Sequence, residues 1–197
     1  MQELIEKLKE FAGGEFRYKV QGNTLTVFGD TDYYVYNFDT NELFYVERGQ
    51  TSKIGAWDNR IGPYFLGCHI QSQLGNGVNY ISSEKLEKVK SVTELDRLIS
   101  EYVSSDLYSI GTIVDRKISL IQEKDQYYII YPEDENKYII DTDTDKDFIF
   151  GRFFYEILSY EHAKNNIRRF EIIFGITFTK AEISSLLGCS DCKRYNS

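Results

Sequence analysis

The sequence is short of the residues from which catalytic and metal sites are most often built. Its 197 residues include two histidines, three cysteines, one methionine and one tryptophan. It contains no serine nucleophile elbow, no Walker phosphate-binding loop and no glycine-rich dinucleotide fingerprint. Each absence is a weak argument, because many enzymes carry no recognisable motif. Together they favour a function other than catalysis, and we predict no catalytic residue and no cofactor.

A long apolar run is also missing. Residues 1–11 alternate charged and apolar side chains and have no apolar centre of a signal peptide. The most apolar late stretch, residues 170–178, contains Glu171 and Thr177 and is too short to span a bilayer. An odd number of cysteines does not suggest the disulfide framework of a small secreted protein. We therefore expect a cytoplasmic protein that does not enter a membrane.

Basic residues are fewer than acidic residues in this chain. The chain has 23 lysines and arginines against 31 aspartates and glutamates, which gives a net charge of −8. Nucleic-acid binding draws most of its affinity from cationic side chains, so this composition predicts no nucleic-acid partner. An acidic surface suits solubility or the capture of a basic protein.

Large apolar side chains are plentiful by comparison. Hydrophobic residues make up 42% of the chain, and it has 16 tyrosines and 13 phenylalanines. A chain of this composition can bury a core, so we expect a folded protein. Because tyrosine carries a polar tip, some tyrosines are expected at a surface.

The first half reads as a helix, a β-meander and a second helix. Apolar residues at helical spacing predict a helix over 2–12, which Gly13 ends. Short β-rich stretches separated by glycine, asparagine and aspartate predict antiparallel strands at 16–21, 24–28, 32–38 and 43–47. Residues 48–60 form a looser stretch. Pro63, near a first helical turn, predicts a helix that ends at Leu74.

The second half repeats this order. Ser91 and Glu94 have the spacing of a capping box and open a helix. Four strands are predicted at 107–114, 117–122, 126–131 and 137–141, followed by a helix over about 147–163. Residues 168–178 fit either a strand or a helix. Thr179 and Glu182 form a second capping box, which opens a C-terminal helix that stops at Gly188.

The two halves also share weak sequence similarity. Gln2-Glu3-Leu4 aligns with Thr93-Glu94-Leu95, and Tyr33-Tyr34-Val35 aligns with Tyr127-Tyr128-Ile129. We therefore predict an α+β fold of two similar helix–antiparallel four-strand meander–helix halves, from an internal duplication, with a C-terminal helix. The expected boundaries are 1–81 for the first half, 82–90 for a linker, 91–188 for the second half and 189–197 for a tail.

A run of alternating aspartates stands before the long helix, at Asp141, Asp143, Asp145 and Asp147. Alternate carboxylates are typical of a calcium loop. Lys146 stands where that loop needs glycine, and Arg152 stands where it needs a bidentate glutamate. We interpret the run as a solvated loop whose last aspartates cap the helix, with weak metal binding as the alternative.

Two further groups could carry chemistry. Cys189 and Cys192 form a Cys-x-x-Cys pair, which could hold zinc together with Cys68 and His69 or act as a redox pair. We interpret the pair as two thiols in a tail, since it follows a helix instead of opening one. His162 lies near the end of a predicted helix, where a cation complements the helix dipole.

The segment from Glu123 to Asp147 is the strongest candidate for a functional surface. It holds nine acidic and three basic residues, a net charge of −6, and its acidic residues alternate with tyrosines. Exposed aromatic side chains supply affinity, and complementary charge speeds association. The alternative is a solvated meander with ordinary acidic turns. The predicted partner-binding residues are Tyr128, Tyr131, Glu133, Asp134, Glu135, Tyr138, Asp141 and Asp143.

These features predict a non-enzymatic protein-binding module. Its most concrete form is an inhibitor or immunity-type protein that neutralises a basic partner such as a toxin or a nuclease. One alternative is a small-molecule-binding or enzymatic α+β domain with a site between the halves, lined by residues 57–60. Another is a homodimer that pairs through exposed strand edges, so the expected state is a monomer or a homodimer.

Overall fold

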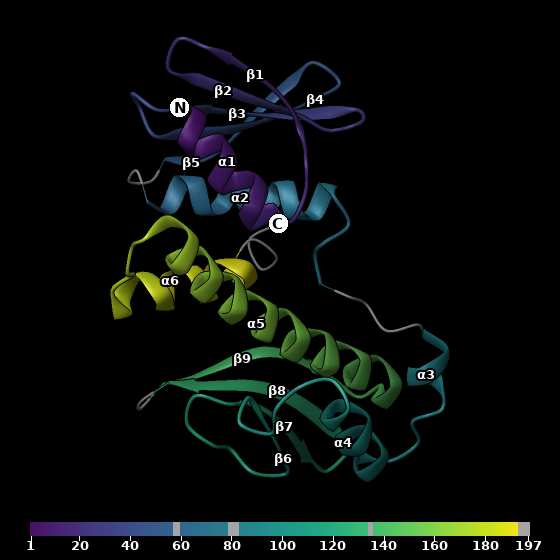
Figure 1. Ribbon diagram of the computed structural model, residues 1–197. Coiled ribbons are helices and arrows are strands. Elements are labelled where there is room, and N and C mark those ends of the chain that lie inside the picture. The colour runs from purple at the N-terminus through teal and green to yellow at the C-terminus, as the bar shows by residue number, and fades with distance from the viewer. Residues whose placement is uncertain (57–59, 79–82, 134–135, 193–197) are drawn as a thin grey trace. The chain divides into compact units, whose positions relative to one another are not determined.

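The computed structural model describes residues 1–56, 60–78, 83–133 and 136–192 and confirms an α+β fold (Figure 1). The chain divides into two compact units. The first consists of residues 1–77 and 164–186, and the second consists of residues 78–163 and 187–197. Each unit contains one sheet, so each is described by itself.

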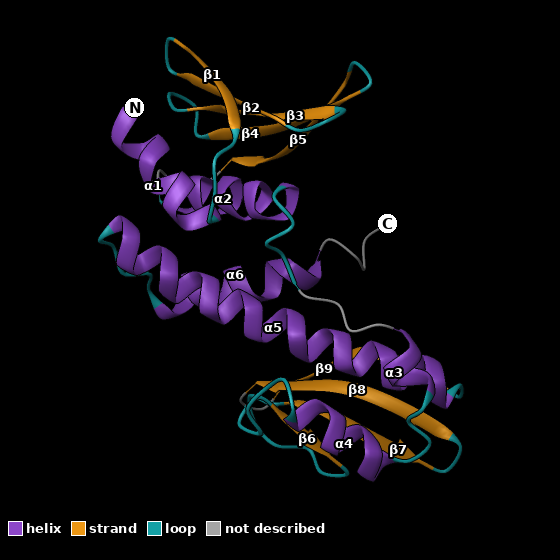
Figure 2. Cartoon of the chain, turned by 45° about the vertical axis from the view of Figure 1, so that its right-hand side comes forward, coloured by secondary structure: helices purple, strands orange, loops and turns teal. Residues whose placement is uncertain are grey.

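The first unit is a five-stranded antiparallel meander with two helices on one face. Its elements are α1 (Gln2–Ala12), β1 (Arg17–Gln21), β2 (Thr24–Phe28), β3 (Asp32–Asn37), β4 (Glu42–Glu47), β5 (Gln50–Ala56) and α2 (Ile61–Gln73). The strand order is β1-β2-β3-β4-β5, and Figure 2 shows α1 and α2 on the same side of the sheet. Alternate strand residues pack with both helices in the core, which contains Ile5, Leu8, Leu25, Val27, Tyr36, Leu43, Leu66 and Ile70.

Two glycines of α2 permit this close packing. A Cβ atom at Gly67 would lie 2.5 Å from the Phe11 ring, and a Cβ atom at Gly62 would lie 2.4 Å from the Tyr36 hydroxyl. Both distances are far shorter than carbon contacts allow, so a side chain at either position would push α2 away from its neighbours.

Strand β5 was not predicted. It lies in the stretch assigned to a loose segment, because Gln50, Thr51, Ser52 and Lys53 are polar and exposed. The turn before it, at Arg48 and Gly49, has positive φ at both residues, 49° and 77°. This is the conformation of the two-residue hairpin turns that match strand twist. An arginine in that position gives no turn signal, which is why the sequence did not indicate the hairpin.

The second unit packs two helices against a four-stranded sheet. Its elements are α3 (Ser83–Glu87), α4 (Val92–Ser100), β6 (Tyr108–Ile110), β7 (Ile118–Glu123), β8 (Gln126–Glu133), β9 (Asn136–Asp143) and the first part of α5 (Lys146–Phe174). The strand order is β6-β7-β8-β9, and Figure 1 shows the first part of α5 running along this sheet. The core joins α4 and α5 to one sheet face through Leu95, Ile99, Ile118, Leu120, Ile129, Phe150, Phe153 and Ile157.

The second sheet differs from the predicted meander at its first strand. β6 has three residues and pairs parallel to β7, whereas β7, β8 and β9 are antiparallel. A parallel pair needs a crossover, and residues 111–117 supply it: the Val114 N–H donates to Ser119 Oγ, and the Arg116 N–H donates to the Pro132 carbonyl. Strand direction leaves no trace in apolar periodicity, so the sequence could not reveal it. The internal duplication is not confirmed.

Helix α5 is longer than predicted. It continues to Phe174, so most of the ambiguous stretch 168–178 is helical, and Gly175 follows it with a φ of 67°. Both predicted capping boxes are present. Ser91 and Glu94 exchange hydrogen bonds at α4, and Thr179 and Glu182 do so before α6 (Lys180–Cys192). The predicted linker, residues 82–90, contains α3 and the buried Val89.

Candidate protein-binding surface on the second sheet

The described members of the predicted partner-binding set lie on the paired strands β8 and β9. Tyr128 and Tyr131 are on β8, and Tyr138, Asp141 and Asp143 are on β9. Asp134 and Glu135 lie outside the described residues, and Glu133 is described for its backbone alone.

Register divides these side chains between the two faces of the sheet. Ile129 belongs to the core, so Tyr128 and Ile130 point to the opposite face. A register shift between Ile129 and Ile130 places Asp141 opposite Ile129, on the face that α5 covers. The eight predicted residues therefore do not form one continuous patch.

Tyr131 and Asp141 are engaged within the second unit. Tyr131 packs against the core, and its hydroxyl lies 3.3 Å from the Tyr160 hydroxyl. Asp141 Oδ2 lies 3.2 Å from Arg152 Nε. The other side of the same guanidinium lies 2.7 Å from Glu156, whose side chain is only 2% exposed. Arg152 thus joins a strand carboxylate to a helix carboxylate, which explains Asp141 as a structural residue.

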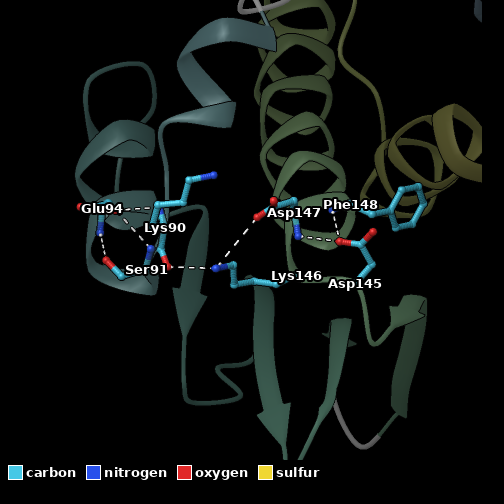
Figure 3. Close-up of polar contacts among 7 residues, drawn as sticks. All are labelled: Lys90, Ser91, Glu94, Asp145, Lys146, Asp147 and Phe148. Carbon is cyan, nitrogen blue, oxygen red and sulfur yellow. Dashed lines mark hydrogen bonds and ion pairs between the residues drawn. The ribbon is translucent and has the colours of Figure 1, made fainter.

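Asp145 of the aspartate run caps α5, which agrees with the interpretation of that run as a helix cap (Figure 3). Asp145 Oδ1 accepts hydrogen bonds from the N–H groups of Asp147 (2.9 Å) and Phe148 (3.2 Å). Asp143 Oδ1 accepts from the Asp145 N–H. Lys146 Nζ donates to the Lys90 carbonyl beside the α4 capping box. Within the described ranges, no group of three metal-ligating side chains occurs.

The exposed apolar residues of this sheet lie on β9. Tyr138 is 53% exposed and Ile139 is 60% exposed, although both are inside a strand. They alternate in direction, so one projects from each side of the sheet edge. Ile139 stands opposite Ile130, and with the half-buried Ile121 and Tyr128 it gives the face away from α5 an apolar character. Of these four residues only Ile139 is exposed, because Ile130 is 9% exposed, so Ile139 is the candidate contact residue of this face.

Ile139 was missed by sequence reasoning. The run Tyr138-Ile139-Ile140 is uniformly apolar, so strict alternation would predict one or two of the three to be buried. The register shift gives Ile140 no partner on β8, and Ile140 packs against the core from that position. No sequence signal marks the shift, and only the structure shows that Ile139 points outward.

Among the cysteine and histidine candidates, the structure describes the surroundings of Cys68 and His162. Burial raises the pKa of the Cys68 thiol to about 12, so the thiol stays protonated at neutral pH. Burial also lowers the pKa of His162. Cys189 and Cys192 lie in α6, with their side chains outside the described part of the structure.

The first unit holds a second group of polar and aromatic side chains. The Tyr34 ring stacks on the His69 ring at 4.5 Å, and the Tyr45 ring is tilted against the Tyr34 ring at 5.0 Å. The Tyr45 hydroxyl donates to Asp32 Oδ2 at 2.9 Å, which raises the pKa of Tyr45 to about 12. These residues are 24 or more positions from His69 in the chain, so no local motif signals the group.

Of the predicted alternative site, residues 57–60, the structure describes only Arg60. Residues 57–59 lie outside the described ranges, and Arg60 forms an ion pair with Glu182 inside the first unit. An open groove of about 320 Å³ in the same unit is lined by Glu10, Asn165, Arg168, Arg169, Ile172 and Ile173.

No described helix is both long and apolar enough to cross a bilayer. No protein-family model matches this chain, and the comparisons with curated proteins and with solved structures gave no match.

Proposed function

We propose that the protein is a non-enzymatic binding module that captures a basic protein partner through the β9 edge of its second sheet. One observation carries the proposal: Tyr138 and Ile139 are more than half exposed on β9, inside the segment with a net charge of −6. In its most concrete form the protein is a cytoplasmic inhibitor or immunity-type protein, and the partner is a toxin or a nuclease. It acts as a monomer or a homodimer.

Apolar and acidic side chains contribute to binding in different ways, and this segment contains both kinds. Tyrosine and isoleucine gain free energy when a partner removes them from water, at about 25 cal/mol per Å² of apolar surface. Exposed carboxylates of the same acidic segment, including Asp145 and Asp147, attract a cationic surface from a distance and raise the association rate. An inhibitor needs only to occupy its target, so this function requires no metal site, and no group of three metal-ligating side chains occurs among the described residues.

The experiment is a quantitative capture from host lysate with three forms of the tagged protein: wild type, Tyr138→Ser/Ile139→Ser, and Ile172→Ser. Ile172 is 73% exposed on α5 and serves as the matched loss of a surface apolar side chain. We expect the wild type and the control to retain one basic protein and the double variant to lose it. Retention should fall as salt rises from about 0.05 to 0.3 M, because charge attraction is screened. Equal retention by the double variant would refute the proposal.

A second candidate function rests on the stack of His69, Tyr34 and Tyr45 beside Asp32. Aromatic rings beside a carboxylate and an imidazole are typical of small-molecule sites. A ligand bound there would raise the melting temperature by mass action, and Tyr34→Ala would abolish that rise. A metabolite screen, with and without divalent metals, that produced no shift in the wild type would exclude this candidate.

A further inference from the structure

We propose that β9 binds its partner by strand addition, in which an extended basic segment of the partner pairs with the outer edge of the second sheet. This inference rests on the proposed function and names what occupies the surface. Among the described residues, β9 pairs with β8 on one side and with no strand on the other. An edge strand presents a row of N–H and C=O groups that another chain can pair with.

β9 is the longest of the four edge strands, and its apolar residues Tyr138 and Ile139 are more exposed than Tyr18 and Val20 of β1. β1 carries Arg17 and Lys19 among its five exposed residues, and charged side chains of this kind discourage pairing. β5 is rich in polar residues and includes Lys53. β6 is only three residues long, which is itself a protection. β9 has eight residues and no proline, and its charged residues Lys137, Asp141 and Asp143 lie on either side of the apolar run Tyr138-Ile139-Ile140.

The exposed side chains of β9 indicate what the added segment carries. Tyr138 projects from one side of the edge and Ile139 from the other, so a single added strand would cover both. Ile139 already stands opposite Ile130 on β8. An apolar residue placed beside Ile139 would extend this cross-strand row by one position. The central residues of the bound segment are therefore apolar.

The acidic residues at one end of the hairpin indicate which charge the ends of the partner's segment carry. Asp143 ends β9, and Asp145 and Asp147 follow it. The pairing of Tyr127 with Asp143 brings the acidic β7–β8 turn to the same end of the hairpin. That turn carries the exposed Glu123 and Asp125. A second copy of this chain would bring its own acidic hairpin against this one, and like charges would oppose the pairing. A segment with lysine or arginine at its ends is complementary.

A defined peptide tests this inference. The probe is the capped octapeptide Lys-Lys-Val-Thr-Ile-Thr-Lys-Lys, whose basic ends suit either strand direction. The matched control replaces both threonines by proline, which keeps the charge and the apolar residues but removes two backbone donors and disrupts a ladder. A second control replaces the four lysines by glutamate. Binding is measured by titration calorimetry at low salt, and residue-level amide exchange of β9 is followed by NMR.

We expect the lysine peptide to bind at least about ten-fold more tightly than either control, a difference of about 1.4 kcal/mol. Main-chain pairing should slow exchange at alternate β9 amides by at least about ten-fold, because it protects only the N–H groups that face the added strand. Ile139→Lys should weaken binding by a similar factor, and Ile172→Lys should leave it unchanged. Absence of binding, equal binding of the proline control, or unchanged exchange at β9 would each overturn strand addition.

The same exchange measurement separates this inference from the proposed function. If the captured partner depends on Tyr138 and Ile139 but leaves β9 exchange unaltered, the binding function stands and strand addition is wrong. If the partner is indifferent to both side chains, the proposed function itself fails.

Discussion

Helix α5 uses one kind of polar contact in the first unit and another in the second. In the first unit, Asn166 and Gln71 of α2 form a buried amide pair with distances of 2.7 and 3.2 Å. In the second, Arg152 lies between Asp141 of β9 and the buried Glu156. The amide pair satisfies its groups without charge, whereas the arginine contact holds charges out of water. The comparison teaches that the two ends of one helix should respond differently to mutation, salt and pH.

The largest expected loss of unfolding free energy comes from breaking the contact between Arg152 and Glu156. Arg152→Ala removes the cation beside the buried Glu156, and loss of one member of a buried pair costs about 3–5 kcal/mol. Urea unfolding followed by circular dichroism should show this loss. Arg152→Met/Glu156→Leu should recover most of it, because apolar side chains replace both charges. A single variant within about 1 kcal/mol of wild type would show that Arg152 is not needed to hold the charge of Glu156.

The neutral contact should be weaker and insensitive to salt. Asn166→Leu leaves the amide of Gln71, which is 3% exposed, with fewer hydrogen bonds, at a cost of about 1–3 kcal/mol. Gln71 also donates to the Phe11 carbonyl, so part of its bonding survives. The loss should be the same at low and high salt because no ionised group is involved. A loss that grew or shrank with salt would break the contrast between the two contacts.

The start of α5 should show a smaller effect. Asp145→Ala removes the acceptor for two N–H groups of the first turn and should cost about 1 kcal/mol. Asp145→Asn keeps an oxygen at the same place and should retain most of the stability. Chemical unfolding of the two variants side by side measures the difference. If both lose the same amount, the charge of Asp145 and not its hydrogen bonding stabilises the helix end.

Much of this fold follows from local sequence signals, and the unpredicted parts have identifiable causes. Ser91 with Glu94 and Thr179 with Glu182 marked helix starts correctly, because a capping box is a local interaction. The aspartate run was correctly interpreted as a cap for the same reason. The parallel β6–β7 pair and strand β5 depend on pairing between distant or polar residues, which periodicity does not encode.

The sequence indicated which segment carries the candidate surface, but not which of its side chains point outward. Composition located the acidic hairpin, and Tyr138, one of its predicted partner-binding residues, is 53% exposed, while its binding role stays a prediction. The register shift at Ile129 and Ile130 then decided which side chains face outward. It turned Asp141 toward Arg152 and left Ile139 in solvent, and a one-residue shift of this kind has no signature in a single sequence.

The smallest expected effect is a pH dependence of the unfolding free energy. It arises from His162, which belongs to the second unit. Burial lowers the folded-state pKa of His162 below its usual value of 6.5, so below that pH the unfolded state binds the proton more readily. His162 therefore contributes its full stability above pH 6.5 and loses it as the pH falls. The difference in unfolding free energy between wild type and His162→Gln should shrink or reverse between about pH 7 and 5, with a slope below one proton. A difference that is constant across this range would show that the imidazole is equally solvated in both states.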